Sequence, residues 1–270
     1  MPDDSKQTQG GQTDPVRVEI KEAIATVTID RGETLNALTD DVLFGVTDAM
    51  ARLGENPAVR VAVLRGAGRR AFASGMDLKV LKTYDPAGTQ QHFDELNGML
   101  YAIERAPFPV IAMVQGYALG GGSELAAACD LRIAGSSARI GVPIGRFGHC
   151  PDRVNVRRML RLISPAHLNA MIMTDTLYDA DDGLRMGFFN WVVPDSALEA
   201  FTYSIARTVS EKSPLGMKAF KQVMAQVQDG SVEHAQDPNE DVVTSLWATR
   251  DFQEGVAAFF ERRKPDFKGE

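Results

Sequence analysis

The sequence predicts an α/β fold with a largely parallel sheet, followed by a helical C-terminal region. Up to about residue 200, segments with strand-type alternation or short apolar runs alternate with amphipathic helical segments. Strands that alternate with helices need crossover connections, and crossovers place the strands parallel. After Ser196 the strand signals stop, and stretches with apolar residues at helical spacing follow.

The 270 residues divide into three parts. Residues 1–14 are polar and rich in Gln and Gly, which predicts a disordered tail with neither a signal peptide nor the arginines of a transit peptide. We expect residues 15–200 to form the α/β core. Residues 201–270 are expected to form the helical region. A chain of this length can bury a sizeable core.

The elements follow one another in a regular order. "VRVEIKEAIATVTIDR" predicts two strands around a turn at Lys21 and Glu22. Thr39 is a candidate N-cap for the helix that follows. A later helix, at about residues 90–105, ends before Pro107, because a residue that precedes proline disfavours helix. Further strands are predicted at "VRVAVLRG", "VIAMVQG" and "DLRIA", and C-terminal helices at "SALEAFTYSIARTVSEK", "PLGMKAFKQVMAQVQ", "NEDVVTSLWATR" and "DFQEGVAAFFERRK".

Composition excludes several classes of protein. The formal net charge is -7, from 36 acidic and 29 basic residues, which argues against a general nucleic-acid binder. Two cysteines are too few for a disulfide scaffold or a zinc site and are typical of a reducing compartment. No apolar stretch has membrane-spanning length. We therefore expect a cytoplasmic protein that binds neither membranes nor nucleic acids and holds no metal.

A glycine-rich stretch is the most informative motif. "YALGGGSELAAACDLRIA", residues 117–134, predicts a strand, a glycine turn and a helix. The first N–H groups of such a helix are unpaired and can stabilise an anion or the oxyanion of an attacked carbonyl, although a tight turn alone also explains the glycines. Neither the Walker pattern nor the G-x-G-x-x-G dinucleotide motif matches. "AFASGMDL", residues 71–78, has similarly small residues after another strand and could supply a second donor to the same oxygen.

Four motifs in order resemble the crotonase family, the enoyl-CoA hydratase/isomerase superfamily. They are "LNAL" (35–38), "AFASGMDL" (71–78), "PVIAMVQGYALGGGSELAAACDLRIA" (109–134) and the terminal "FFERRKPDFKGE". The resemblance implies a crotonase-like spiral of ββα units whose C-terminal helices assemble homotrimers, often paired into homohexamers. It also implies an acyl-CoA thioester as substrate. We expect no cofactor, because coenzyme A is part of that substrate.

The resemblance also implies roles for particular residues. The backbone N–H groups of Ser74 and Gly121 would form the oxyanion hole. The basic residues Arg262, Arg263 and Lys264 could approach the CoA phosphates, frequently those of a neighbouring subunit, or form a solvated helix end. Residues implied to bind the substrate or CoA are Glu33, Thr34, Leu35, Ala73, Gly75, Met76, Asp77, Leu78, Gly120, Ile144 and Lys264.

Two carboxylates are candidate catalytic groups. Hydratases of the family use two glutamates, and the first matches Glu124, which could instead be a helix N-terminal residue favoured by the macrodipole. The second would fall at Ile144, which cannot transfer a proton. Asp152 matches an aspartate that shuttles protons in the family's dienoyl-CoA isomerases and acts as a nucleophile in its aryl-CoA dehalogenases. It could also be the N-cap of the helix in "PDRVNVRRMLRL".

The alternatives differ in the chemistry that they need. Dehalogenation is disfavoured, because Asn97 and Ile144 stand where those enzymes have His and Trp. His149 and Cys150 are adjacent but lack an orienting partner for a thiol nucleophile. We therefore predict an enoyl-CoA hydratase/isomerase-type enzyme with isomerisation favoured over two-glutamate hydration. An acyl-CoA decarboxylase and a catalytically weak CoA-binding protein remain the alternatives.

Overall fold

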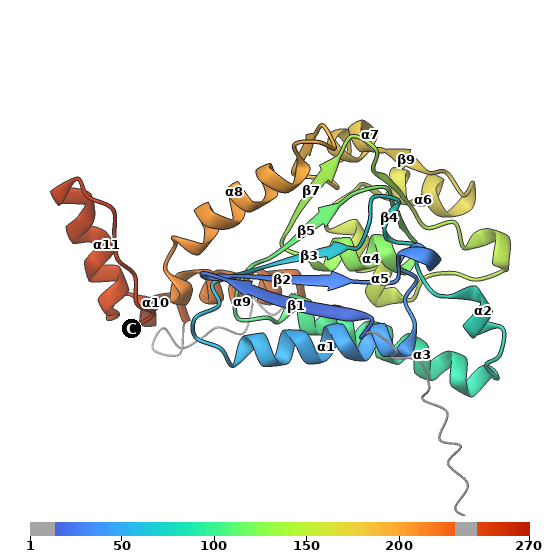
Figure 1. Ribbon diagram of the computed structural model, residues 1–270, viewed down its shortest axis with the longest axis horizontal. Coiled ribbons are helices and arrows are strands. Elements are labelled where there is room, and N and C mark those ends of the chain that lie inside the picture. Colours follow the sequence, from blue (N-terminus) through green and yellow to red (C-terminus); the bar gives the residue numbers. More distant parts are fainter. Residues whose placement is uncertain (1–13, 230–241) are drawn as a thin grey trace, which may run out of the picture.

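Two sheets organise the chain (Figure 1). The computed structural model describes residues 14–229 and 242–270, so the predicted N-terminal tail lies outside the described residues except for Asp14. The first sheet has six strands in the order β1-β2-β3-β5-β7-β10, and the second has four in the order β4-β6-β8-β9. Mixed α/β architecture with mainly parallel strands was predicted and is confirmed.

The chain enters the first sheet through a hairpin. Strands β1 (Val16–Lys21) and β2 (Ile24–Ile29) pair antiparallel, with Lys21 opposite Ile24. Glu22 turns the chain with a φ of 57°. The predicted pair of strands around Lys21 and Glu22 is therefore correct.

From β3 onward, consecutive strands enter the two sheets in turn, and a helix usually returns the chain. The pairs are β3 (Val61–Gly66) with β4 (Ala71–Ala73), β5 (Val110–Val114) with β6 (Tyr117–Leu119), and β7 (Leu131–Gly135) with β8 (Arg139–Gly141). Helix α1 (Asp40–Gly54) leads into β3, the returning helices are α3 (Pro86–Glu104) and α4 (Gly121–Ala128), and β9 (Tyr178–Asp179) and β10 (Trp191–Val193) complete the sheets. This succession is the predicted spiral of ββα units.

Both faces of the six-stranded sheet are buried. In β3, Ala62 and Leu64 belong to the main core with α1 and α3, whereas Val61 and Val63 face the other side, where Leu198 and Ala206 of helix α8 pack. Alternation with a period of two explains this division, because successive side chains of a strand point to opposite faces. The strand reads as an almost continuous apolar run for the same reason.

The remaining helices complete the structure. Their bounds are η1 (Gly32–Thr34), α2 (Leu78–Leu81), η2 (Gly145–Phe147), α5 (Arg153–Leu160), α6 (Pro165–Met173), α7 (Ala180–Arg185), α8 (Leu198–Ser210), α9 (Pro214–Asp229), α10 (Val242–Leu246) and α11 (Arg250–Glu261). Every described strand precedes α8, as predicted for the C-terminal region. The start of the helix predicted at "NEDVVTSLWATR" lies outside the described residues. Helix α11 extends away from the sheets, at the opposite end of the molecule from α2 (Figure 1).

Two predicted helix starts differ in detail. Helix α3 begins at Pro86 rather than near residue 90, because Asp85 caps it by accepting a hydrogen bond from the Gly88 N–H at 2.7 Å. Aspartate followed by proline is a recognisable helix start that the sequence reasoning passed over. Thr39 stands at the predicted N-cap position of α1, but its side chain makes no capping hydrogen bond.

Candidate active site

Two glycine loops meet at the N-terminus of α4. Gly120 adopts a φ of 52° between β6 and α4, and Gly75 adopts a φ of 88° after β4. A Cβ added to Gly75 would lie 2.7 Å from the Leu119 carbonyl oxygen and 3.4 Å from the Gly121 nitrogen. A Cβ on Gly122 would lie 2.0 Å from the Ala73 carbonyl oxygen. The two loops predicted to act together are therefore packed backbone against backbone.

The amide of Gly121 is free to bind an oxygen, whereas that of Ser74 is not. Gly121 is the first residue of α4, and its N–H has no hydrogen-bond acceptor within the described chain. The Ser74 N–H already donates to the Leu35 carbonyl at 3.1 Å. The prediction that Ser74 supplies an oxyanion donor thus needs correction, because its N–H serves to join two loops.

Met76 presents the alternative amide. Leu38 forms a parallel bridge with Met76 in which the Leu38 N–H donates to the Gly75 carbonyl at 2.8 Å and the Asp77 N–H donates to the Leu38 carbonyl at 3.4 Å. In such a bridge the residue between the two partners directs its own N–H to the opposite side. The Met76 N–H accordingly has no acceptor among residues 14–229 and 242–270.

Asn36 holds a third loop beside these two. It is fully buried with a φ of 55°, and its side chain donates to the carbonyls of Ala67 and Ala71 at 3.0 and 2.7 Å. Its Oδ1 accepts the Arg31 N–H at 3.0 Å. Residues 33–35 lie against the 73–77 loop, since the Ser74 N–H donates to the Leu35 carbonyl and the Ser74 hydroxyl to the Thr34 carbonyl. That both segments bind CoA stays a prediction. Asn36 itself was missed, although asparagine is a frequent residue at positive φ.

A groove runs beside the anchored loop. Its volume is about 1110 Å³, and Arg31, Glu33, Thr34 and Tyr84 are among the residues that line it. Asp77 lies 3.7 Å from Arg31, which lines this groove, and it caps α2 by accepting the Lys79 N–H. Predicted substrate-binding residues from two separate motifs therefore lie together.

Glu124 is buried in α4, three residues after Gly121. Its side chain lies in the first half of α4, the residue is only 6% exposed, and its carboxyl makes no hydrogen bond with any described residue. Burial raises the pKa of Glu124 to about 7, the charge of Arg158 opposes this rise, and the charge of Asp152 adds to it. A carboxyl with this pKa can both accept and donate a proton near neutrality.

Asp152 is the N-cap of α5, which confirms one of the two roles predicted for it. Its Oδ1 accepts the Asn155 N–H at 2.8 Å, and its Oδ2 accepts a hydrogen bond from the Asn97 side chain at 2.7 Å. Unlike Glu124 it is exposed, so the two carboxylates do not share one dry pocket as the sequence reasoning supposed. Its proposed role in proton transfer stays a prediction.

A spiral of ββα units with an unpartnered, buried glutamate next to a glycine-lined helix start agrees with the comparison to known families. The family profile described as enoyl-CoA hydratase/isomerase matches residues 19–270. This chain belongs to the enoyl-CoA hydratase/isomerase family. It is therefore an acyl-CoA enzyme, and the predicted crotonase resemblance is confirmed.

Family members with known names are similar over nearly the whole chain. A crotonyl-CoA hydratase from Syntrophomonas wolfei is 32% identical, and the match covers 93% of this chain and 96% of the hydratase. A (E)-benzylidenesuccinyl-CoA hydratase from Thauera aromatica is 34% identical, covering 94% and 99%. The crystal structure of an enoyl-CoA hydratase/carnithine racemase from Magnetospirillum magneticum has a TM-score of 0.90 at 30% identity, covering 96% and 97%.

Ile144, predicted to stand where hydratases of the family have their second glutamate, is apolar and packed. Ile144 is half-buried against the main core, at the start of η2. His149 nearby lies with its ring 4.9 Å from that of Phe93, and Cys150 is exposed.

The C-terminal basic residues do not reach the site of the same chain. Lys264 pairs with Glu211, and Arg263 pairs with Glu254 at 2.5 Å, on the extended α11 region. The hydrogen bond from Arg263 holds the pKa of Glu254 down at about 2. Helix α11 lies far from α2 in the same chain (Figure 1), so the predicted contact of Lys264 with CoA would be made to a neighbouring subunit and stays a prediction.

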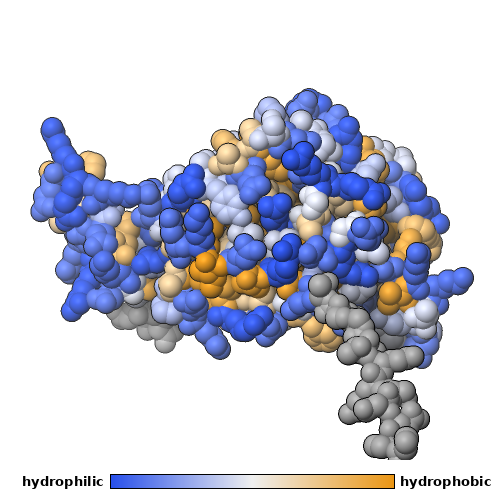
Figure 2. Space-filling view, viewed as in Figure 1, coloured by the Kyte–Doolittle hydropathy of each residue, from blue (hydrophilic) through white to orange (hydrophobic). Residues whose placement is uncertain are grey.

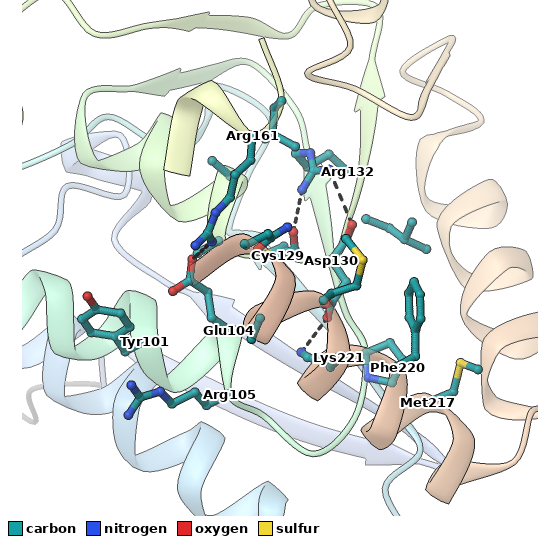
Figure 3. A pocket seen from close by; sticks show the side chains of 18 of the residues that line it. Tyr101, Glu104, Arg105, Cys129, Asp130, Arg132, Arg161, Met217, Phe220 and Lys221 are labelled. Carbon is teal, nitrogen blue, oxygen red and sulfur yellow. Dashed lines mark hydrogen bonds and ion pairs between the residues drawn. The ribbon is translucent and has the colours of Figure 1, made fainter. Parts of the chain in front are cut away.

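A second cavity, of about 410 Å³, lies at the other end of α4 (Figure 3). Its charged lining residues are committed to structural contacts. Lys221 lies 2.7 Å from Asp130 and donates to two backbone carbonyls, and Arg132 donates to the carbonyls of Phe188 and Cys129. Glu124 does not line this cavity, so we place the chemistry at the glycine loops.

Within residues 14–229 and 242–270, no three His, Cys, Asp or Glu residues are arranged to hold a metal ion. None of the described helices combines the length and apolar character needed to cross a bilayer.

Proposed function

We propose that this enzyme moves a proton on an enoyl-CoA thioester and thereby shifts its double bond. The single observation that carries the proposal is Glu124, a buried carboxyl with no hydrogen-bond partner in the described chain and a pKa raised to about 7. A buried carboxylate without a hydrogen-bond partner lowers the stability of the fold. Carboxyls with perturbed pKa values in clefts are typical of active sites. Its position in the first turns of α4, three residues after Gly121, supports a role next to a bound carbonyl.

The reaction needs an oxygen site and a proton carrier. The thioester oxygen would lie between the N–H groups of Gly121 and Met76, which replace the predicted pair of Gly121 and Ser74. Ionised Glu124 removes a proton from the α- or γ-carbon, and the electron pair moves to the thioester oxygen as an enolate. Protonated Glu124 then returns the proton to the other carbon, so that no atom is gained or lost. The two amides stabilise the developing negative charge.

Asp152 is the second carboxylate in this proposal. Its charge contributes to the raised pKa of Glu124, so the two groups are electrostatically coupled. The apolar Ile144 favours isomerisation, because hydration in this family is expected to need two glutamates to hold water. Hydration is the second candidate, and it is favoured by the names of the similar proteins, several of which are hydratases.

A turnover comparison tests the proposal. A β,γ-enoyl-CoA ester and crotonyl-CoA are supplied separately, and formation of the α,β-enoyl and 3-hydroxyacyl products is followed by chromatography. We expect double-bond isomerisation to be faster than hydration. Faster hydration by the parent protein would show that Ile144 does not disfavour water addition and that the hydratase assignment is correct. Release of CO₂ from a malonyl-type ester as the main activity would instead identify a decarboxylase.

Replacing Ile144 by Glu is expected to raise hydration of crotonyl-CoA. The new carboxylate would supply the second group that can hold and activate water. Ile144→Gln is the matched control, because it is of the same size as Glu but cannot act as a base. We expect about tenfold or greater hydration in Ile144→Glu than in Ile144→Gln. Equal rates in the two variants would contradict the proposed role of this position.

We propose that the enzyme assembles as a trimer or a dimer of trimers. Phe259 and Phe260 of α11 are each 78% exposed, and Phe220 and Trp247 are about 60% exposed. Apolar surface also crosses the middle of the face shown in Figure 2. Exposed apolar patches of this kind are typical of protein interfaces.

Light scattering on the purified protein measures its mass. We expect three or six times the chain mass of 29.4 kDa. Phe259→Lys with Phe260→Lys should lower that mass without changing the helical content, whereas an exposed substitution away from α11, Glu19→Lys, should leave it unchanged. A parent protein with the mass of one chain would contradict the proposed assembly.

A further inference from the structure

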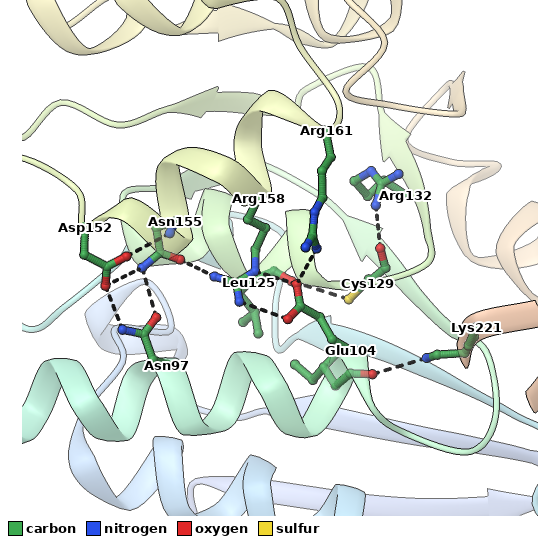
Figure 4. Close-up of polar contacts among 11 residues, drawn as sticks. Asn97, Glu104, Leu125, Cys129, Arg132, Asp152, Asn155, Arg158, Arg161 and Lys221 are labelled. Carbon is green, nitrogen blue, oxygen red and sulfur yellow. Dashed lines mark hydrogen bonds and ion pairs between the residues drawn. The ribbon is translucent and has the colours of Figure 1, made fainter. Parts of the chain in front are cut away.

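A chain of hydrogen bonds joins α3 to α5 and ends at Asp152 (Figure 4). It begins at Glu104, whose two carboxylate oxygens accept from Arg158 Nε and Nη2 at 2.8 and 3.1 Å. Arg158 then donates through Nη1 to Oδ1 of Asn155. Asn155 and Arg158 are each only 2% exposed, so hydrogen bonds between these side chains replace the hydrogen bonds that they would make to water.

Arg158 determines which way the Asn155 amide points. A guanidinium has donors and no acceptor, so the atom that faces it must be the amide oxygen. The NH₂ group of Asn155 therefore faces the other way, toward Oδ1 of Asn97 at 3.1 Å and Oδ2 of Asp152 at 3.3 Å. The same logic applies to Asn97, whose oxygen is occupied by Asn155 and whose NH₂ donates to Oδ2 of Asp152 at 2.7 Å.

The network thus presents only donors to Asp152. Oδ2 accepts two amide N–H groups, and Oδ1 accepts the backbone N–H of Asn155 at 2.8 Å. Each carboxylate oxygen has about two acceptor sites. Within the described chain, Oδ2 is saturated and Oδ1 retains one acceptor site.

We propose that Asn97 and Asn155 are positioning residues that hold Asp152 by its Oδ2 atom and leave one site on Oδ1 at which the carboxylate takes or shares a proton. This inference rests on the proposed role of Asp152 in proton transfer. The helix cap and the proton site are then different functions of one side chain, because the cap uses the other acceptor site of Oδ1. Arg158 and Glu104 act behind the two asparagines by fixing the direction of their amides.

The titration of Glu124 can report on this network, because charged groups of the network act on the Glu124 carboxyl. Helix α5 supplies Arg158 and Asp152, which act on Glu124 in opposite directions. Helix α3 supplies Glu104, which pairs with Arg158, and Tyr101, whose ring centroid lies 5.7 Å from the Arg158 guanidinium carbon. Strands β4 and β6, which also pack against α4, contribute Tyr117 as their titratable residue. Any change in where Asp152 carries its charge should therefore shift the titration of Glu124.

Asn97→Leu is the decisive variant, because leucine has a similar size and no hydrogen-bonding group. We expect kcat for double-bond isomerisation to fall about tenfold or more, since a misplaced catalytic group is costly, while KM changes by less than about threefold. Gln91→Leu, an exposed change on the same helix, should leave both constants unchanged. In an Asp152→Asn background, which retains a capping oxygen, Asn97→Leu should cause no further loss. The proposal would be overturned if the losses in kcat from Asn97→Leu and Asp152→Asn multiply in the double variant, or if Asn97→Leu changes KM alone.

A second measurement needs no substrate. Carbon-13 NMR of the labelled Glu124 carboxyl measures its titration midpoint, which we expect near the raised pKa of about 7 in the parent. Asp152→Asn should lower this midpoint because it removes a like charge. Asn97→Leu should move the midpoint toward the Asp152→Asn value and should have no effect in that background. A midpoint unchanged by Asn97→Leu would overturn the positioning role. If the parent turns over no enoyl-CoA ester, the proposed function fails, and this titration still decides whether the amides position Asp152.

Discussion

Glu124→Gln is expected to lower isomerisation of an enoyl-CoA ester about 10²-fold or more, because glutamine fills the same space but cannot carry a proton. KM should change little, since the substrate oxygen binds to backbone amides that the substitution leaves in place. Glu199→Gln, a change at an exposed glutamate on α8, is the matched control and should retain full activity. Turnover that survives Glu124→Gln would contradict the role of this carboxyl as the proton carrier.

The same carboxyl gives the activity a pH dependence. Glu124 must be ionised to remove a proton from carbon, and burial raises its pKa to about 7. The rate should therefore fall as the pH decreases below about 7. In Asp152→Asn the acid limb of the profile should move to lower pH, because the neighbouring negative charge is gone.

Glu124→Gln should lower activity but raise the free energy of unfolding above about pH 7. The pKa of Glu124 is about 7 in the folded protein and 4.5 in the unfolded chain, so its contribution is fully present below pH 4.5 and is lost as the pH rises to about 7. The difference corresponds to about 3 kcal/mol of unfolding free energy above pH 7. We expect thermal unfolding to show Glu124→Gln more stable than the parent at pH 8 and equally stable at pH 4. A variant that is less stable at pH 8 would show that the carboxylate is stabilised by contacts in the fold.

Gly122→Ala is expected to disrupt both the fold and the site. The added Cβ would lie 2.0 Å from the Ala73 carbonyl oxygen, and neither backbone can move freely because the two loops are packed together. Overpacking of this kind costs about 1–3 kcal/mol or more. The shift that relieves the clash would also separate the Gly121 amide from the 73–77 loop, so turnover should fall with stability.

Gly98→Ala provides the control for this effect. Gly98 lies in α3 with no atom within 4 Å of an added Cβ. Alanine there should stabilise the helix by about 0.5–1 kcal/mol, as expected for a helix interior. Denaturant unfolding of both variants measures the difference. A Gly122→Ala protein as stable as the parent would mean that the loops can separate without cost.

Local signals were sufficient to predict most of the elements. The strands around Lys21 and Glu22, the strand–glycine–helix order at residues 117–134 and the change to helices after Ser196 were all predicted correctly, because each depends on a pattern within one short segment. The start of α3 at Pro86 was missed even though its signal, Asp85 followed by proline, is equally local. The start of this helix therefore depends on neighbouring residues and needs no tertiary contact.

By itself the sequence determined the fold class through the periodicity of neighbouring residues, and its glycine motifs carried the resemblance to the family, while the catalytic roles of Glu124 and Asp152 stay predictions. Only the tertiary structure decided which amides are free. Ser74 is occupied by Leu35, which lies in another loop, and Met76 is not. It also decided that Asn97 and Asp152, 55 residues apart, are joined by a hydrogen bond. The physical reason is that hydrogen-bond partners and desolvation depend on which distant segments pack together, and no pattern within one segment contains that contact.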